Sequence, residues 1–301
     1  MSLLVMGTVA LDDIETSKQA RKNLLGGSGA HCAMSASLFT QVHLVGIVGE
    51  DFPKRHIALL RSKGVDLSSV EISQGRTFHW SGAYDAKDWN TAVTKQTELG
   101  VLEGYAPRIT EAQKRLPYVF LANNTPDLQK AVLDQVRSPK LVGLDSMNLW
   151  ITHMRKPLLG LLKRVDLFVA NDREAQMLTG EQNLFSAARA LRKMGPRLIV
   201  VKKGEHGVIF FCDEFCFSFP AFPVMRVLDP TGAGDTFAGG LMGYLAKTGR
   251  LTRANLKRAC LYATVCASFN VEGFGPSRTA ILSVKDVEAR LKEFLVFIQP
   301  E

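Results

Sequence analysis

One stretch, three quarters of the way along the chain, combines glycines with an acid in a pattern that can do chemistry. Residues 229–240 read DPTGAGDTFAGG, between an apolar, strand-like segment that ends at residue 228 and a helical pattern. Glycines let a backbone approach a ligand closely. The first amides of a helix lack intrahelical partners and carry the positive end of its dipole, so this turn predicts an anion site.

The acid in this turn, Asp235, would repel a bound phosphate at rest. Its position makes sense if the carboxylate takes a proton from a hydroxyl while the backbone amides hold the charge of a moving phosphoryl group. On the short sequence GAGD alone, a glycine-rich turn without catalytic function is the favoured interpretation. The sequence around the turn must therefore decide between the two interpretations.

The bulk properties indicate an ordinary soluble protein. The chain has 301 residues, 46% hydrophobic and 22% charged, and a net charge of +8. Without an apolar run of about 18 residues, no membrane span is expected. The basic residues form no single block and no nucleic-acid-binding motif appears, so we expect no nucleic-acid partner. A positive field favours anionic substrates such as ATP.

The cysteines and the N-terminus indicate a reduced, cytoplasmic protein. Five cysteines occur without a CxxC pair, and the first residues show no basic region of a signal peptide. Cys212 and Cys216 lie among phenylalanines, so we interpret them as core or strand residues. The six histidines show no metal-binding spacing such as HExxH.

Alternating strand and helix patterns predict an α/β fold with a mostly parallel central sheet and helices on both faces. Strands are expected at 3–6, 42–48, 70–72, 118–122, 141–144, 167–170 and 198–202, with a hairpin at 207–212 and 214–219. Helices are expected at 30–39, 52–63, 126–136, 151–164, 173–178, 184–194, 233–247, 253–269 and 284–298. Neither GxxxxGK[ST] nor GxGxxG follows a strand, which argues against a P-loop NTPase or a Rossmann oxidoreductase.

The region around residues 76–84 differs in character. Phe78, Trp80 and Tyr84 alternate with polar residues, a pattern typical of a strand. One interpretation is a half-buried antiparallel sheet, and the other is a lid with aromatic side chains over a pocket. Both can hold together.

Residues 229–240 closely resemble the C-terminal signature of the PfkB (ribokinase-like) carbohydrate kinase family. Further stretches resemble the family in the right order: GTVALD at 7–12, GGSG at 26–29, NDRE at 171–174 and KKGEHG at 202–207. The family usually places an Asn after the two glycines, where this chain has Ser28 to His31. The resemblance implies a three-layer ribokinase-like sandwich with a small β-sheet lid.

The resemblance also implies functions for individual residues. Asp235 is the expected base, with the amides of Gly232, Ala233 and Gly234 around the transferred group. The acceptor is expected at Asp12, Gly26 and Gly27. The nucleotide is expected at Asn171, Lys202, Gly204, Gly232 and Gly234. Glu174 is expected to bind Mg²⁺ through water, and Asp229, near Gly273 and Gly275, a monovalent cation such as K⁺.

Structural alternatives remain for these motifs. Asp12, next to Asp13, is also suited to a turn. Asn171 and Glu174 also have the spacing of a helix capping box. Residues 202–207 also suit a β-turn with solvent-exposed lysines.

We therefore expect a single kinase domain over 1–301, with a discontinuous lid from about 9–21 and 75–104. The expected reaction is transfer of the γ-phosphoryl group of ATP, with Mg²⁺, to a hydroxyl of a sugar or nucleoside. Arg76 and Lys87 leave a phosphorylated sugar possible as acceptor. The lid aromatics can also form a homodimer interface. The alternative function is a catalytically silent, nucleotide-binding regulatory module of the same fold.

Overall fold

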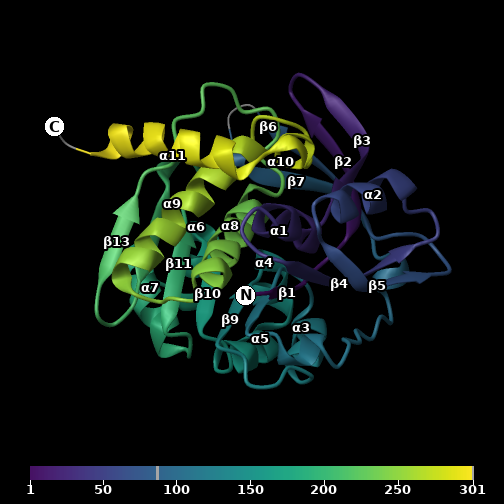
Figure 1. The fold of residues 1–301 in the computed structure, drawn as a ribbon, viewed down its shortest axis with the longest axis horizontal. Coiled ribbons are helices and arrows are strands. Elements are labelled where there is room, and N and C mark those ends of the chain that lie inside the picture. Colours follow the sequence, from purple (N-terminus) through teal and green to yellow (C-terminus); the bar gives the residue numbers. More distant parts are fainter. Residues whose placement is uncertain (86–87, 300–301) are drawn as a thin grey trace.

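The computed structural model describes residues 1–85 and 88–299. A sheet of nine strands, in the order β13-β12-β11-β10-β9-β8-β1-β4-β5, runs through the centre of the molecule (Figure 1). The strands are β1 (Leu3–Met6), β4 (Val42–Gly49), β5 (Asp66–Ser73), β8 (Tyr118–Leu121), β9 (Leu141–Asp145), β10 (Leu167–Asn171), β11 (Leu198–Lys202), β12 (Val208–Phe211) and β13 (Cys216–Phe219).

The predicted parallel sheet is confirmed. Every neighbouring pair from β5 to β11 is parallel, and only β12 and β13 join the edge in antiparallel fashion. The carboxyl ends of seven strands therefore meet at one edge of the sheet. In open α/β sheets this edge is where ligands bind.

Helices cover both faces of the sheet because successive strand residues point to opposite sides. In β1, Leu3 and Val5 belong to one core cluster, and Leu4 and Met6 to the other. One face carries α1 (Ser28–Ala36), α2 (Lys54–Ser62), α8 (Ala233–Thr248) and α9 (Arg253–Asn270). The other carries α3 (Pro126–Leu133), α4 (Asn148–His153), α5 (Arg155–Leu162), α6 (Asp172–Thr179) and α7 (Leu184–Lys193). Against α9 pack α10 (Ser277–Ile281) and α11 (Val284–Ile298).

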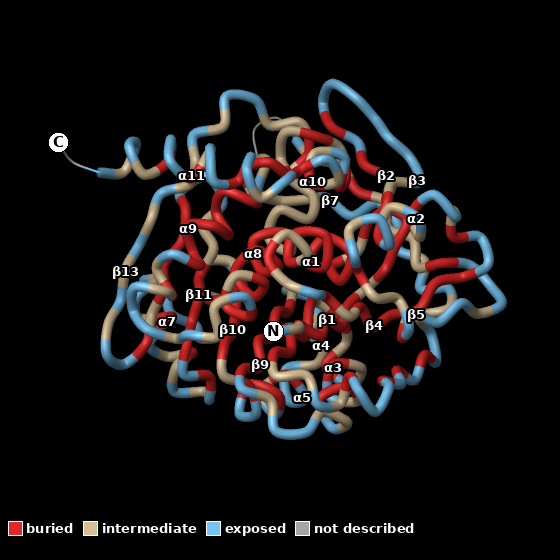
Figure 2. Tube along the Cα trace, in the orientation of Figure 1, coloured by how far each residue is buried: buried red, intermediate tan, exposed pale blue. Residues whose placement is uncertain are grey.

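Two buried helices, α1 and α8, lie side by side over the sheet (Figures 1 and 2). Glycines allow this close approach: a Cβ added at Gly239 would lie 2.2 Å from the Cys32 carbonyl oxygen, and one at Gly243 would lie 2.8 Å from the Ala36 Cα. The contacts advance along both chains in the same direction, so the helices run parallel. Both therefore begin at the same end of the molecule.

A second, four-stranded sheet has the order β3-β2-β6-β7, and we call it the lid sheet. It comprises β2 (Ala10–Thr16), β3 (Ala20–Gly26), β6 (His79–Asp85) and β7 (Asp88–Glu98). The antiparallel pairing predicted around residues 76–84 is present between β6 and β7, whereas β2 and β6 pair in parallel. The intervening chain, with β4, α2 and β5, returns to the same end of the lid before β6 begins. Lys87 lies outside the described residues.

The helix expected over 151–164 is instead two helices. The chain breaks at Met154, which has φ −129° and ψ 36°, between α4 and α5. The cause is Pro157, which has no amide hydrogen and whose ring would clash with the carbonyl of residue 153 in a continuous helix.

The strand-like segment expected before residue 229 is also wrong: residues 220–230 form no strand. Pro220 and Pro223 remove backbone donors from this stretch. The last residues of this segment are held instead by the chain after α9, because the amide of Leu228 donates to the Val271 carbonyl over 2.8 Å. The signature turn is thus fixed by the segment that follows α9, not by the central sheet.

Candidate active site

The signature turn lies at the N-terminus of α8. Gly232 caps the helix with φ 73°, a conformation that favours glycine. A Cβ at this position would also lie 2.5 Å from the ring of His31, so the backbone packs directly on the imidazole of α1. Burial lowers the pKa of His31 to about 4, although the neighbouring Asn270 acts in the opposite direction. His31 is therefore uncharged near neutral pH, and its ring packs against the backbone of the signature turn.

Asp235 lies in the first turn of α8, where the predicted base was expected. Burial raises the pKa of its carboxyl to about 7, and the charge of Asp145 acts in the same direction, whereas Lys202 lowers it. A carboxyl with this pKa is matched to proton transfer near neutral pH. Asp235 thus combines the predicted position at a helix N-terminus with a pKa near neutrality.

Sequence reasoning missed Asp145, whose charge acts on Asp235. It ends β9 and is 3% exposed, and its carboxylate lies 3.5 Å from Nζ of Lys202 at the end of β11. Burial would lower the pKa of Lys202, but Asp145, Glu174 and Asp235 together raise it. The available signal was an acid after four apolar residues at the carboxyl end of a parallel strand.

Asn171 and Glu174 form the capping box of α6 that one interpretation predicted. The Asn171 side chain accepts from the Glu174 amide over 2.8 Å, and the Glu174 carboxylate accepts from the Asn171 amide over 2.7 Å. The capping box does not remove Glu174 from the site. Glu174 is 9% exposed, and burial raises its pKa to about 8, which Lys202 partly counteracts and Asp145 reinforces.

Asp12 lies where the β2–β3 hairpin of the lid meets the body. A Cβ at Gly26 would lie 2.0 Å from the Asp12 carboxylate, so only glycine leaves room for it. Gly27 has φ 91° and leads directly into α1. Burial raises the pKa of Asp12 to about 8, with Asp229 acting in the same direction and the Gly27 amide in the opposite one. The predicted acceptor residues therefore lie together.

Asp229 ties the signature to the segment after α9. Its carboxylate accepts from the amide of Thr231 and from the amide of Gly275, each over 2.9 Å. The side chain is fully buried, and burial raises its pKa. The structure thus brings Gly275 to Asp229, as the family resemblance implied.

The turn containing Gly204 follows β11 and is covered by the lid. Gly204 has φ 55°, and a Cβ there would lie 2.1 Å from the side chain of Asn90 in β7. Asn90 Nδ2 also donates to Glu205 over 2.5 Å, and Arg173 of α6 donates to Thr91 over 2.5 Å. The lid therefore reaches the elements expected to bind the nucleotide.

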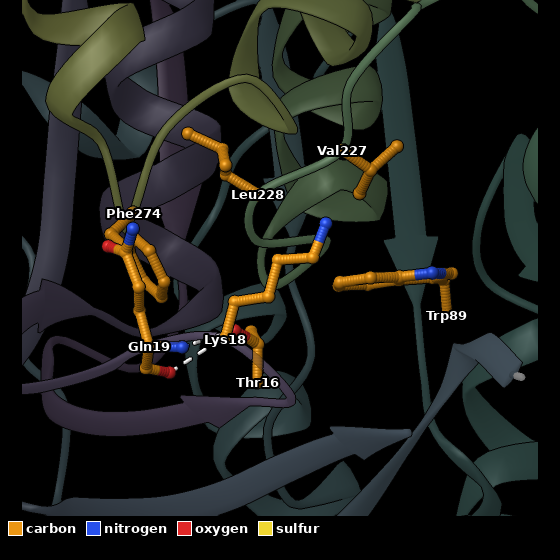
Figure 3. A pocket seen from close by; sticks show the side chains of 7 residues that line it. All are labelled: Thr16, Lys18, Gln19, Trp89, Val227, Leu228 and Phe274. Carbon is orange, nitrogen blue, oxygen red and sulfur yellow. Dashed lines mark hydrogen bonds between the residues drawn. The ribbon is translucent and has the colours of Figure 1, made fainter. Parts of the chain in front are cut away.

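A small pocket lies between the tip of the β2–β3 hairpin and the body (Figure 3). The Lys18 side chain extends between Phe274 and Trp89, toward Val227 and Leu228. Arg76, in contrast, points to the lid surface: its side chain is 78% exposed and lies 3.8 Å from Glu98. Its position gives no reason to expect a phosphorylated acceptor.

Comparison with known proteins now identifies the family. The profile of the pfkB family carbohydrate kinases matches residues 118–281, more than half of the chain. The chain belongs to the PfkB carbohydrate kinase family. A cytidine kinase of Thermococcus kodakarensis is 34% identical over 253 residues, covering 81% of this chain and 88% of the relative. A nucleoside kinase of Methanothermobacter thermautotrophicus is 27% identical and covers 91% of this chain and 90% of the relative.

Solved structures agree with the PfkB fold. The nucleoside kinase of Burkholderia thailandensis in complex with inosine has a TM-score of 0.80 at 18% identity, covering 99% of this chain and all of that one. A putative ribokinase II from E. coli in complex with ATP and Mg²⁺ has a TM-score of 0.81 at 18% identity, covering 97% and 99%. The predictions of a ribokinase-like fold and of a PfkB-family sugar or nucleoside kinase are confirmed. None of the helices in the described part of the chain is suited to crossing a membrane.

Proposed function

We propose that this PfkB-family kinase transfers the γ-phosphoryl group of ATP to a hydroxyl of a nucleoside. The observation that carries the proposal is Asp235, an acid in the first turn of α8 whose pKa is raised to about 7. An ionised carboxylate at this place can take the proton of the attacking hydroxyl. The neighbouring backbone amides can hold the charge that develops on the transferred group.

The remaining residues divide between the two substrates. Asp12, with the close backbone of Gly26 and Gly27, orients the acceptor by accepting hydrogen bonds from its hydroxyls. The amides of Gly232, Ala233 and Gly234 face the phosphoryl group. Asn171, Lys202 and Gly204 contact the nucleotide, with Lys202 opposite the phosphates. Closure of the lid excludes water and so favours transfer over hydrolysis.

The donor set also fits Mg²⁺. The carboxylates of Asp145 and Glu174 are buried and that of Asp235 is half-buried, and their charges act on one another. Oxygen is the ligand that Mg²⁺ prefers. Within residues 1–85 and 88–299, no three acidic, histidine or cysteine side chains converge to hold a metal by themselves. Glu174 is therefore assigned to Mg²⁺ through water. When bound, Mg²⁺ neutralises charge on the phosphates.

A monovalent cation such as K⁺ fits beside Asp229. This carboxylate is fully buried and, among the described residues, has no basic partner. A buried charge of this kind calls for a compensating one. Activity is expected to rise when K⁺ replaces a bulky organic cation at constant ionic strength, and equal activity in both salts contradicts a cation at Asp229.

Two observations favour a nucleoside over a free sugar. Relatives that match most of the chain are a cytidine kinase and a nucleoside kinase. The lid also brings Tyr84 and Trp89 to the body, and aromatic rings suit a flat base. Cytidine is therefore the first acceptor to test.

The test is ADP formation with a panel of nucleosides and free sugars, and Asp235→Asn as the variant. We expect at least one nucleoside to exceed ribose in kcat/KM. Asp235→Asn should lower kcat about 10²- to 10⁴-fold, the usual contribution of a general base, and leave ATP binding nearly unchanged. A protein that binds ATP but phosphorylates no acceptor would instead be the silent regulatory module.

The lid is also proposed as a homodimer interface. Val93 of β7 is 62% exposed and Leu99 just beyond it is 47% exposed, so an apolar part of the lid faces outward. Sedimentation velocity of the wild type and of Val93→Lys tests this surface. A dimer that persists in Val93→Lys, or a monomeric wild type, contradicts it.

A further inference from the structure

The lid is docked on the body through hydrogen bonds of several residues. Asn90 bonds to Glu205, in the turn that contains Gly204, and Thr91 bonds to Arg173 of α6. A third contact is different, because it reaches the signature turn itself. The hydroxyl of Thr231 donates to the phenolic oxygen of Tyr84, the sixth residue of β6, over 3.1 Å.

Thr231 is the residue that directly precedes Gly232. Its amide donates to Asp229 over 2.9 Å, and its carbonyl accepts from Asn270 Nδ2 over 2.8 Å. These two contacts come from the body and use only the backbone of Thr231. The hydroxyl of Thr231 also interacts with the Asp229 carboxylate, and Tyr84 adds a contact to this hydroxyl from the lid. Part of the order of this turn therefore depends on where the lid lies.

The environment keeps the Tyr84 phenol neutral. Burial raises the pKa of Tyr84, and the carboxylates of Asp229, Asp12 and Asp235 act in the same direction. A neutral phenol both accepts and donates a hydrogen bond. Because the phenol stays protonated, its contact to Thr231 persists over the whole pH range of an assay.

We infer that Tyr84 is a positioning residue for phosphoryl transfer: when the lid is closed, it fixes Thr231 and thereby the amides of residues 232–234 that receive the transferred group. The inference rests on the proposed kinase function. It assigns to the lid a second effect besides the exclusion of water. The amides are fully ordered only when the lid is closed.

The consequence is a link between acceptor binding and the anion site. The lid hairpin that carries Asp12 also pairs with β6, since Thr16 of β2 lies opposite Tyr84. A bound acceptor that holds this hairpin closed therefore also holds Tyr84 on Thr231. ATP bound without an acceptor meets a less ordered turn, which disfavours wasteful hydrolysis.

The experiment is a double-mutant cycle with Tyr84→Phe and Thr231→Val, which each remove one hydroxyl at nearly constant shape. Each single variant should lower kcat about 3- to 10-fold, the effect of one neutral hydrogen bond, with little change in the KM of ATP. Because the two hydroxyls form one contact, the double variant should be no worse than the worse single variant. Thr231→Ser, which keeps the hydroxyl, should retain most of the activity.

Tyr105→Phe is the matched control. Tyr105 is buried, and its hydroxyl donates to the Gly46 carbonyl over 3.0 Å, away from the signature. Its kcat should equal that of the wild type. Wild-type activity in Tyr84→Phe, or effects of the two substitutions that multiply in the double variant, would overturn the inference.

A second measurement does not depend on catalysis. Amide hydrogen exchange in a peptide spanning residues 229–235 should be faster in Tyr84→Phe and Thr231→Val than in wild type and Tyr105→Phe. If no acceptor is phosphorylated but this difference is present, the proposed function fails and the contact stands. Equal exchange in all four proteins overturns the contact itself.

Discussion

The ammonium group of Lys202 lies 3.5 Å from the carboxylate of Asp145, at the ends of two strands of the central sheet. Asp145 is 4% exposed in its side chain and Lys202 17%, so water screens the pair poorly. Glu174 and Asp235 add their charges to the same cluster. Lys202 is thus the cation that offsets the charges of two buried acids, Asp145 and Glu174, and of the half-buried Asp235.

Removing this cation should destabilise the fold. Lys202→Met keeps the length of the side chain but leaves Asp145 buried without its partner, which costs about 3–5 kcal/mol of unfolding free energy. The double variant Lys202→Met/Asp145→Asn should recover a large part of this loss. Urea denaturation at pH 7 measures both. Additive losses in the double variant would show that the two groups do not stabilise each other.

Activity should depend on ionisation of Asp235. Its pKa is raised to about 7, and a general base must be ionised, so kcat/KM should increase as the pH rises through about 7 and then level off. Stopped assays from pH 5.5 to 9 with saturating ATP give this profile. Calorimetric ATP affinities over the same range control for titration of the nucleotide. A flat profile below pH 7, at constant ATP affinity, contradicts the function given to Asp235.

Asp12→Asn should raise the stability of the protein at pH 8 while it weakens acceptor binding. The pKa of Asp12 is about 8 in the folded protein and near 3.8 when unfolded, so between these values the folded state binds the extra proton. Stability from this group is therefore complete below pH 4 and is lost as the pH rises toward 8. Asn carries no charge, so the variant should be more stable than wild type at pH 8.

Above pH 8, where Asp12 is ionised, the same substitution should raise the KM of the acceptor, because a carboxylate accepts more hydrogen bonds from hydroxyls than an amide does. Thermal unfolding at pH 5 and pH 8, together with the KM of the acceptor above pH 8, tests both effects. A variant that is less stable than wild type at pH 8, or has an unchanged KM, contradicts this account of Asp12.

Gly232→Ala should lower kcat by more than the backbone strain of an alanine at positive φ can explain. The positive φ of Gly232 costs an alanine about 1–2 kcal/mol, and the added methyl would also meet the ring of His31 at 2.5 Å. Gly180→Ala is the matched control, since Gly180 has φ 78° and open space around it. Its loss of stability should be limited to the strain, and its kcat should be unchanged.

The outcome is read from kcat and unfolding free energy measured on both variants. Gly232→Ala should lose activity well beyond its loss of stability. Equal effects of the two substitutions on kcat would mean that the close packing of Gly232 on His31 does not matter for the reaction.

The sequence determined the local elements of this protein. Local signals such as the apolar run at 3–6, the glycines at 26–27 and 232–234, and the capping residues at 171 and 174 each act over a few neighbouring residues. The signature itself placed Asp235 at a helix N-terminus. The break between α4 and α5 also has a local cause, Pro157. The helical spacing of apolar residues over 151–164 predicted one continuous helix in spite of this proline.

The tertiary structure alone decided which distant residues meet. Lys202 meets Asp145 from 57 positions away, and Tyr84 meets Thr231 from 147 positions away. These contacts depend on strand order and on the docking of the lid, and no local period encodes either. The same holds for the segment before residue 229, which is held by the chain after α9 because its prolines cannot join a sheet.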